Sequence, residues 1–416
     1  MKSTRKYLAR YAEPETALAH ELFLTTAKRH NWQHCLVIPA YKESEDFYQR
    51  LVATLLQQQD VLLIVVLNQP DKLANTHPEN TRLWQHLIEQ THQRQVLNNL
   101  HLRDIPDTNS ALLLVNRFSP EQTIPEKQGV GLARKIGADI ALSLIDKQYV
   151  EAPWIYTSDA DAHLPSSYFT ALKKMTDATG KTPYAAAIYP FRHLCDDSPI
   201  GRATRLYEQS MQQYVAGLHS AGSPYAFQTI GSTIAISSHH YAQVRGFPKR
   251  SGGEDFYLLN KLAKTGAINN LQAPEIFIEA RQSNRVPFGT GPAINKLLLK
   301  QNLYSAPIFY HPSVFTELKS WLSAIPVSQK TAFGDLPLAS ATVQALLAIG
   351  VVQAIEAAHK VCSSTQSYNR HINTWFDGFK TLKFIHHLRE HSYPSIDITA
   401  LKKYTIATTN TLPPPP

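Results

Sequence analysis

The 416-residue sequence has little cysteine and no long hydrophobic run. Its three cysteines, Cys35, Cys195 and Cys362, are far apart and form no Cys-x-x-Cys pair. This spacing predicts free thiols in a reducing compartment and indicates neither a disulfide framework nor a zinc site. The longest apolar stretch, near 345–352, is too short to span a bilayer, and the basic N-terminus lacks the apolar segment of a signal peptide. We therefore expect a cytoplasmic protein, with peripheral contact to a membrane as the alternative.

Acidic residues are in the minority, because 41 Lys and Arg face 33 Asp and Glu, for a formal net charge of +8. This charge fits a phosphorylated ligand, an anionic acceptor or a negatively charged membrane surface, and it does not choose among them. Basic residues interleaved with aromatic ones form no run, so nucleic acid binding is not predicted. The length and the 43% hydrophobic content allow one large α/β domain or two domains.

Apolar runs alternate with helical patterns over the first 290 residues. Strands are predicted at 35–41, 61–67, 111–115, 154–161, 184–189 and 229–237, and helices at 13–29, 44–58, 79–91 and 130–145. This alternation is typical of a doubly wound α/β sheet, in which ligands bind beyond the carboxyl ends of the strands.

The segments outside this pattern are predicted to differ from it. We expect an N-terminal helix within 1–30, the α/β domain over 31–290, a mainly helical region over 291–408 and a disordered proline-rich tail over 409–416. The helical region has apolar stripes at 342–359 and 371–384. Its aromatic residues Trp375, Phe376 and Phe379 are expected to belong to a core.

Two carboxylates one residue apart, Asp159 and Asp161, end the predicted strand at 154–161. Side chains at positions i and i+2 of a strand point the same way, so both carboxylates can meet one divalent cation. Hard oxygen ligands suit Mg²⁺ or Mn²⁺, which keep open positions for the phosphate oxygens of a substrate. The alternative is an Asp-x-Asp sequence that arises by chance on a solvated loop.

Several motifs in order resemble the family 2 glycosyltransferases of GT-A fold. The segment 229–259 contains a Gly-Ser strand entrance, a helix, Gly-Phe, and Glu-Asp at the start of an apolar helix. The segment 37–43 is similar to the opening strand of that family, 131–137 resembles its Ala-Arg-Asn-x-Gly helix, and 159–161 matches its metal motif. The resemblance covers about 35–285.

The resemblance implies a GT-A-type mixed sheet and non-processive, inverting transfer of a sugar from a nucleotide-diphosphate donor to an acceptor hydroxyl, with Mn²⁺ or Mg²⁺ as cofactor. Asp255 matches the catalytic base and Glu254 is its neighbour. The candidate metal ligands are Asp159, Asp161 and His311. The candidate donor-binding residues are Pro39, Ala40, Tyr41, Glu43, Asn68, Arg134, Asp159, Arg281 and Arg285. The helical region after 291 is expected to close over the cleft and shape the acceptor side.

The basic loop after 280 is a further candidate, because the guanidinium groups of Arg281 and Arg285 can neutralise a diphosphate. An ordinary surface turn is the alternative. The sequence also departs from the family: Val286 replaces the Trp of processive members, Lys135 replaces an Asn, and Asn68 begins a segment where many members carry paired acids that contact the base.

Three other functions remain open. One is a retaining GT-A enzyme that acts on a small anionic acceptor such as phosphoglycerate, and another is a non-catalytic sugar-nucleotide-binding protein. The third is a diguanylate cyclase, suggested by Gly252-Gly253-Glu254-Asp255-Phe256. It is disfavoured because the two acids are reversed and a helical pattern follows where a cyclase needs a strand.

Overall fold

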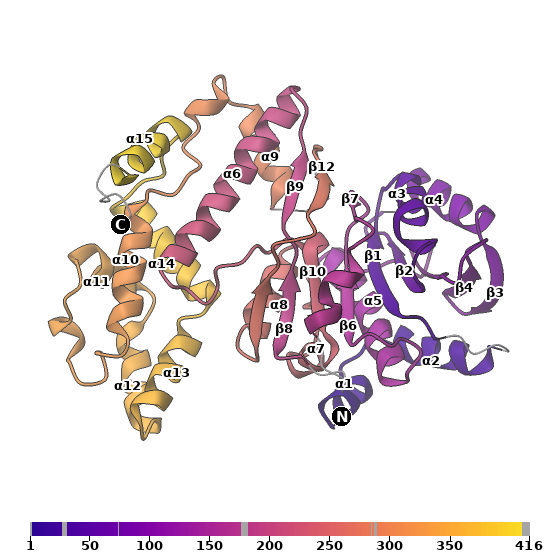
Figure 1. Ribbon diagram of the computed structural model, residues 1–416, viewed down its shortest axis with the longest axis horizontal. Coiled ribbons are helices and arrows are strands. Elements are labelled where there is room, and N and C mark those ends of the chain that lie inside the picture. Colours follow the sequence, from indigo (N-terminus) through magenta and orange to yellow (C-terminus); the bar gives the residue numbers. More distant parts are fainter. Residues whose placement is uncertain are drawn as a thin grey trace. The chain divides into compact units, whose positions relative to one another are not determined.

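The computed structural model describes residues 2–26, 31–73, 75–175, 182–283, 285–286 and 289–409, and the chain forms two compact units (Figure 1). The first unit comprises Met1–Leu194 and Thr229–Pro292, and the second comprises Cys195–Gln228 and Ala293–Pro416. The chain leaves the first unit a second time after Pro292, beside the boundary expected at 290. The assignment of Cys195–Gln228 to the second unit was not expected, because the sequence did not predict the long helix in this segment.

The first unit is built on a nine-stranded mixed sheet with the strand order β11, β8, β10, β6, β1, β2, β5, β4, β3 (Figure 1). Its strands are β1 (His34–Ala40), β2 (Val61–Asn68), β3 (His92–Leu97), β4 (Leu100–Asp104), β5 (Ala111–Arg117), β6 (Trp154–Thr157), β8 (Tyr184–Ile188), β10 (Ile234–Ser237) and β11 (Ala267–Asn270). Strand β1 pairs in parallel with β2 and β6, whereas β10 lies antiparallel between β6 and β8. The predicted α/β class with a mixed sheet is confirmed.

The central strands explain why the sequence carries unbroken apolar runs. Every residue of β2 is buried, as expected for a parallel strand covered on both faces. The hairpin of β3 and β4 was not predicted, because its exposed outer strand His92–Leu97 is polar.

A second, three-stranded sheet has the order β7 (Ala162–His163), β12 (Ile276–Glu279), β9 (Phe191–Leu194). These strands are too short to give a clear period in the sequence. Phe277 of β12 pairs with His163 of β7 in antiparallel register, and the Glu279 N–H donates to the Asp161 carbonyl at 3.0 Å. The sheet therefore brings the chain after Glu279 beside the Asp-x-Asp motif.

Helices and helical turns cover the sheets of the first unit. They are α1 (Lys2–Arg10), α2 (Glu15–Thr25), α3 (Asp46–Leu51), the π-helical η1 (Val52–Leu56), α4 (Pro78–Glu89), α5 (Gly129–Asp146), η2 (Phe169–Met175), η3 (Gly231–Thr233), α7 (Ser238–Gln243) and α8 (Glu254–Leu262). The helices predicted at 79–91 and 130–145 are confirmed as α4 and α5. The helix predicted at 44–58 is a short α-helix followed by a π-helical turn.

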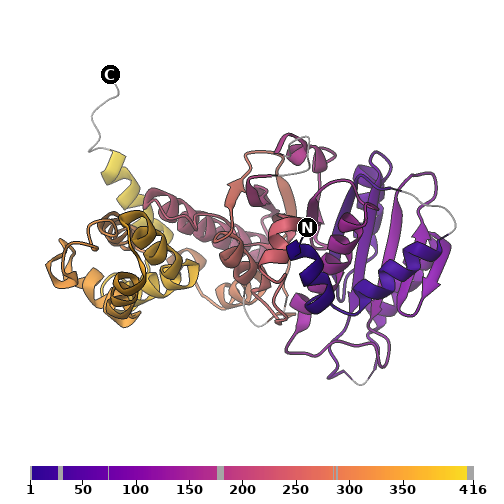
Figure 2. The same ribbon diagram turned by 90° about the horizontal axis from the view of Figure 1, so that it is seen from below.

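The N-terminal segment forms two helices instead of the one expected over 13–29 (Figure 2). Helix α1 was not predicted, and 27–30 lie outside the described residues. Leu24, near the end of α2, is 63% exposed, so it does not belong to the apolar face of this helix. Tyr7 of α1 donates a 2.5 Å hydrogen bond to Asp139 of α5, which also binds Lys135 Nζ at 2.6 Å. This buried contact attaches α1 to α5.

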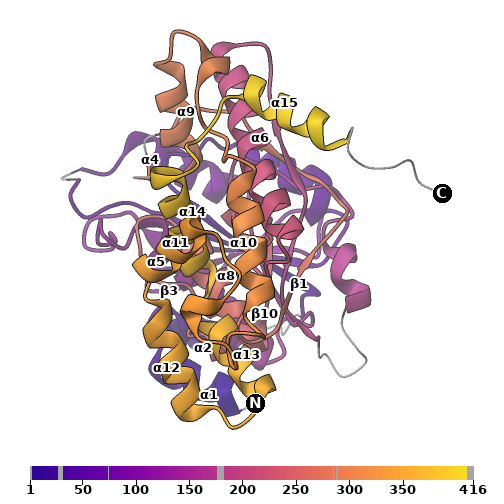
Figure 3. The ribbon, with the colours of Figure 1, turned by 90° about the vertical axis from the view of Figure 1, so that its left-hand side faces the viewer.

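The second unit is helical throughout its described regular elements (Figure 3). They are α6 (Pro199–Ser220), α9 (Thr290–Leu298), which begins at the unit boundary, η4 (Leu303–Ser305), α10 (Ser313–Ala324), η5 (Phe333–Asp335), α11 (Ser340–Ala348), α12 (Val351–Val361), α13 (Thr365–Trp375), α14 (Gly378–His391) and α15 (Ile398–Thr409). The mainly helical C-terminal region is thus confirmed. Within the predicted tail, 410–416 lie outside the described residues.

Both long helices predicted in this region are broken. The segment 342–359 is divided at Gly350, whose φ of 85° is unfavourable for residues with a side chain, into α11 and α12. The segment 371–384 is divided where Asp377 caps α14 by accepting hydrogen bonds from two backbone N–H groups. Among the described helices none is by itself long and apolar enough to cross a membrane. Helices α11 and α12, with a bend between them, reach the necessary length and apolar character only when they are taken together.

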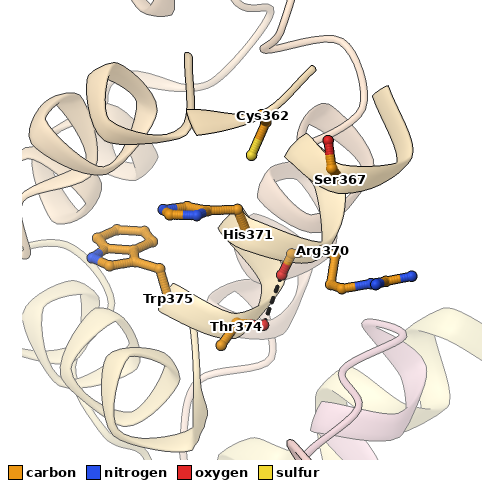
Figure 4. A pocket seen from close by; sticks show the side chains of 6 residues that line it. All are labelled: Cys362, Ser367, Arg370, His371, Thr374 and Trp375. Carbon is orange, nitrogen blue, oxygen red and sulfur yellow. Dashed lines mark hydrogen bonds between the residues drawn. The ribbon is translucent and has the colours of Figure 1, made fainter. Parts of the chain in front are cut away.

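Helix α13 lines a shallow pocket of about 400 Å³ on the second unit (Figure 4). Its lining residues are Cys362, Ser367, Arg370, His371, Thr374 and Trp375. Phe376 is 2% exposed and belongs to the core, as expected, whereas Trp375 is only half-buried and lies at this pocket.

Candidate functional site

The parallel strands β1, β2 and β6 end at one edge of the main sheet, and several candidate residues, among them Asn68, Asp159 and Asp161, lie at or just beyond these ends. The Asn68 side chain at the end of β2 donates to the Ala40 carbonyl at the end of β1 at 3.0 Å. Asn68 is 5% exposed, so its amide ties the two strand ends together. Its predicted contact with the donor, and those of Pro39 and Ala40, stay predictions.

A left-handed turn directs Glu43 toward this edge. Lys42 has a φ of 55°, and its N–H donates to the Asn80 side chain at 3.0 Å. A side chain is rarely found in this backbone conformation, and such positions gather at functional sites. The turn leaves Glu43 only 8% exposed.

Glu43, Asp161, Arg281 and Arg285 form a compact ionic group, called here the Glu43 cluster. Arg281 donates two hydrogen bonds to Glu43, of 2.6 Å to Oε2 and 2.9 Å to Oε1. The Arg281 Nη2 also lies 2.7 Å from Asp161 Oδ2. Arg285 pairs with Glu43 and donates to the Tyr41 carbonyl at 2.9 Å. Residues from distant parts of the sequence are therefore brought together as ion pairs.

Arg134 is the centre of a second ionic group, the Arg134 cluster, with Asp159 and Glu254. Its Nη2 lies 2.8 Å from Asp159 Oδ1 and its Nε lies 3.1 Å from Glu254 Oε1. Arg134 is 2% exposed, and it also donates to the carbonyls of Ser158 and Gly231. A Cβ at Gly231 would lie 2.5 Å from Arg134 Nη2, so a side chain there would displace the guanidinium group. One arginine therefore joins the metal motif to the Glu-Asp motif.

Asp255 is the second residue of α8, which follows Gly253, whose φ of 69° favours glycine. The helix predicted to open at Glu-Asp is thus confirmed. Asp255 Oδ1 accepts a 2.7 Å hydrogen bond from the Phe256 N–H. Burial, and then the negative charge of Glu254, raise the pKa of Asp255 to about 7.

The two clusters and Asp255 carry more negative than positive charge. Five carboxylates, when ionised, face the three guanidinium groups of Arg134, Arg281 and Arg285, an excess of two negative charges. Burial raises the pKa of Asp161 to about 6; Arg281 opposes this rise, and Asp159 adds to it. Such an excess fits a bound divalent cation.

Asp159 and Asp161 suit Mg²⁺ or Mn²⁺ as donors. The structure groups no three His, Cys, Asp or Glu side chains into a complete metal site among the residues it describes. Mg²⁺ commonly uses one or two carboxylates and fills its other positions with phosphate oxygens and water, so two aspartates fit. His311 lies in the second unit, where its Nε2 is 2.8 Å from the Tyr404 hydroxyl, and its role as a metal ligand stays a prediction.

Arg50 of α3 is a site residue that the sequence did not indicate. Its Nη2 donates at 2.8 Å to the carbonyl of Ala160, between the two aspartates, and its Nη1 lies 3.1 Å from Glu279. Glu279 also contacts His163 at 3.1 Å. No sequence motif marks these residues, because their contacts depend on how β7 and β12 pair.

No protein-family model matches this chain, and no curated protein matches it. A mannosyltransferase from Pyrobaculum calidifontis in complex with GDP-Man and Mn²⁺ is similar at 16% identity and a TM-score of 0.34, over 88% of this chain and 93% of that one. GalNAc-T7 with UDP, GalNAc and Mn²⁺ is similar at 10% identity and a TM-score of 0.36, over 88% of this chain. The chain spans 59% of the length of GalNAc-T7. A mycobacterial protein has 14% identity and a TM-score of 0.33, over 68% of this chain and 77% of that one. Similarities at this level do not establish a family.

Proposed function

We propose that the protein is a metal-dependent, non-processive glycosyltransferase of family 2-like GT-A type that uses a nucleotide-diphosphate sugar. The observation that carries the proposal is the pair of contacts made by Arg134, which brings Asp159 of the Asp-x-Asp motif and Glu254 of the Glu-Asp motif to one guanidinium group. The resemblance assigns the first motif to the metal and the second to the base, and they meet at the carboxyl edge of the sheet.

Asp159 and Asp161 would hold Mn²⁺ or Mg²⁺, which offsets the charge of the leaving diphosphate when bound. Arg281 and Arg285, which pair with Glu43 and lie on the loop that follows β12, would donate hydrogen bonds to the same diphosphate. Arginine suits this role because its planar group can bind two oxygens of a phosphate at once.

Asp255 supplies the acid–base step. The acceptor hydroxyl gives its proton to the Asp255 carboxylate while its oxygen attacks the anomeric carbon, and the bond from that carbon to the diphosphate oxygen breaks. The electron pair leaves with the nucleoside diphosphate, and the configuration at the anomeric carbon inverts. A base with a pKa of about 7 suits this step near neutral pH.

The proposal includes an acceptor class and a cellular location, but no particular acceptor. The net charge of +8 is compatible with an anionic acceptor without selecting one, and the three free cysteines support a cytoplasmic location. A retaining enzyme with a small anionic acceptor would share the metal and donor residues. A non-catalytic binding protein would share the donor site without turnover.

The test is release of nucleoside diphosphate from a panel of nucleotide sugars by the wild type with Mn²⁺, with and without small hydroxyl acceptors that include phosphoglycerate. We expect release from at least one donor, and we expect EDTA to abolish it. The anomeric configuration of the product then distinguishes inversion from retention. Donor binding without release, for every acceptor tried, would favour the non-catalytic alternative.

A further inference from the structure

Arg281 contacts two carboxylates that have different expected roles. Its two hydrogen bonds to Glu43 fix the guanidinium, while its Nη2 also reaches Asp161 Oδ2 at 2.7 Å. Asp161 is one of the two acids that fit the divalent cation. The guanidinium group and the cation would therefore compete for the same carboxylate.

We propose that Asp161 exchanges Arg281 for the divalent cation when the donor diphosphate binds, and that Glu43 is the positioning residue that keeps Arg281 within reach of both partners. This inference rests on the proposed function and concerns how the donor and the metal are bound together. In the exchange the Arg281 Nη2, which contacts the Asp161 carboxylate, donates instead to an anionic phosphate oxygen. The hydrogen bonds from Arg281 to Glu43 persist.

The burial of the cluster gives the physical reason for an exchange. The side chains of Glu43 and Asp161 are 8% and 18% exposed, and that of Arg281 is 30% exposed. A buried charge that loses its partner is costly, so Asp161 needs a new cation if Arg281 leaves it. Without Asp161, Arg281 and Arg285 would share the single carboxylate of Glu43. When the cation and the diphosphate bind together, Asp161 gains the cation as its partner and Arg281 gains an anionic phosphate oxygen.

The exchange predicts that metal and nucleotide bind cooperatively. The cation alone has to displace Arg281 from Asp161, which leaves Arg281 and Arg285 with only the carboxylate of Glu43 between them, so the affinity for the cation should be low. A nucleoside diphosphate supplies a further anion and should raise the affinity for the cation. By linkage, the cation then raises the affinity for the nucleotide by the same factor.

Arg285 provides a matched control within the same cluster. It pairs with Glu43 and with the Tyr41 carbonyl, so Arg285→Gln removes one positive charge nearby and leaves the contact between Arg281 and Asp161 in place. Arg82 on the exposed surface of α4 provides a second control, for the Arg-to-Gln change itself.

The experiment measures Mn²⁺ affinity by electron paramagnetic resonance, alone and with saturating UDP or GDP, for the wild type, Arg281→Gln, Arg285→Gln and Arg82→Gln. We expect Arg281→Gln to bind Mn²⁺ alone about tenfold more tightly, as loss of a competing charged hydrogen bond would allow, and to lose most of the cooperativity. Arg285→Gln should change the affinity less and keep the cooperativity, and Arg82→Gln should match the wild type.

Equal effects of Arg281→Gln and Arg285→Gln would overturn the exchange, because they would show a general effect of charge. Wild-type Mn²⁺ affinity and cooperativity in Arg281→Gln would overturn it as well. If Arg281→Gln does not fold, Arg281→Lys replaces it in the experiment. An ammonium group cannot hold both carboxylates as the guanidinium does, so we expect a smaller gain in Mn²⁺ affinity. If neither UDP nor GDP binds the wild type in a Mn²⁺-dependent way, the proposed function fails at the same time.

Discussion

At the scale of single residues, the two acids that open α8 have different environments. Glu254 pairs with the buried Arg134 at 3.1 Å, whereas Asp255 accepts a hydrogen bond from the Phe256 N–H and has a pKa raised to about 7. Glu254 thus takes part in a buried ion pair with Arg134, and Asp255 is the acid whose raised pKa would suit a base. The sequence could place both at a helix start, but only the fold shows which of them Arg134 binds.

Asp255→Asn should lower transfer by about 10²- to 10⁴-fold, the usual contribution of general-base catalysis, because the amide keeps the shape and loses the basicity. Donor affinity should stay close to that of the wild type. The measurement is the initial rate of nucleoside diphosphate release, with Asp197→Asn, at a side chain that is 96% exposed, as the matched control. Transfer at the wild-type rate would assign the base to another residue, with Glu254 the next candidate.

The raised pKa of Asp255 also predicts how activity and stability change with pH. Activity should rise as pH increases through about 7, because the base must lose its proton. Between the ordinary value of 3.8 and about 7 the folded state holds the proton more tightly, so this residue contributes stability that declines as pH rises through that window. Asp255→Asn should therefore raise the melting temperature, relative to the wild type, more at pH 8 than at pH 4.5. A constant difference and a flat activity profile would contradict the assignment.

At the scale of secondary structure elements, the site depends on how closely α5 approaches the sheet. Helix α5 carries Arg134 and packs across β1, β2 and β6. The sequence predicted this helix, the central strands and the Asp-x-Asp and Glu-Asp motifs, because long periodic segments and paired acids are local signals. It could not predict the small sheet of β7, β9 and β12, which brings Arg281 to Asp161, because strand pairing between short segments is set by the tertiary fold.

Gly137→Ala tests the close packing of α5. A Cβ at this position would lie 2.4 Å from Val37 Cγ1 in β1 and 3.3 Å from Val66 Cγ2 in β2. Overpacking of this kind costs about 1–3 kcal/mol, more than the roughly 1 kcal/mol that alanine adds to helix stability. Chemical denaturation should show a lower midpoint. Gly334→Ala, where a Cβ would meet nothing within 4 Å, should leave the midpoint nearly unchanged, and equal midpoints for the two variants would contradict the packing argument.

At the scale of the whole molecule, the chain enters the second unit twice. The core of that unit combines Leu218, Ala221 and Ala226, from the segment Cys195–Gln228, with residues that follow 292, such as Phe315 and Trp321. The boundary predicted near 290 lies beside the point where the chain leaves the first unit for the second time. The sequence did not assign 195–228 to the helical unit, because the residues that bury the end of α6 lie far along the chain, after 292.

A chain that ends after Pro292 should therefore fold poorly, because the apolar side chains near the end of α6 lose their partners. We expect it to bind the dye ANS and to aggregate. A variant in which a flexible Gly/Ser linker replaces 195–228, and which also ends after Pro292, should bind less ANS and remain soluble. Equal ANS binding by the two shortened chains would contradict the division into units.

The central claim is that a divalent cation held by Asp159 and Asp161 binds the diphosphate of a nucleotide sugar. Its most direct test is isothermal titration calorimetry of wild type and Asp161→Asn with a panel of nucleotide sugars, with Mn²⁺ and with EDTA, and with Asp197→Asn as the matched control. The account predicts that wild type and Asp197→Asn bind at least one nucleotide sugar in a Mn²⁺-dependent way, and that Asp161→Asn loses this dependence. Mn²⁺-dependent binding of equal strength in Asp161→Asn, or no Mn²⁺-dependent binding by the wild type, would contradict it.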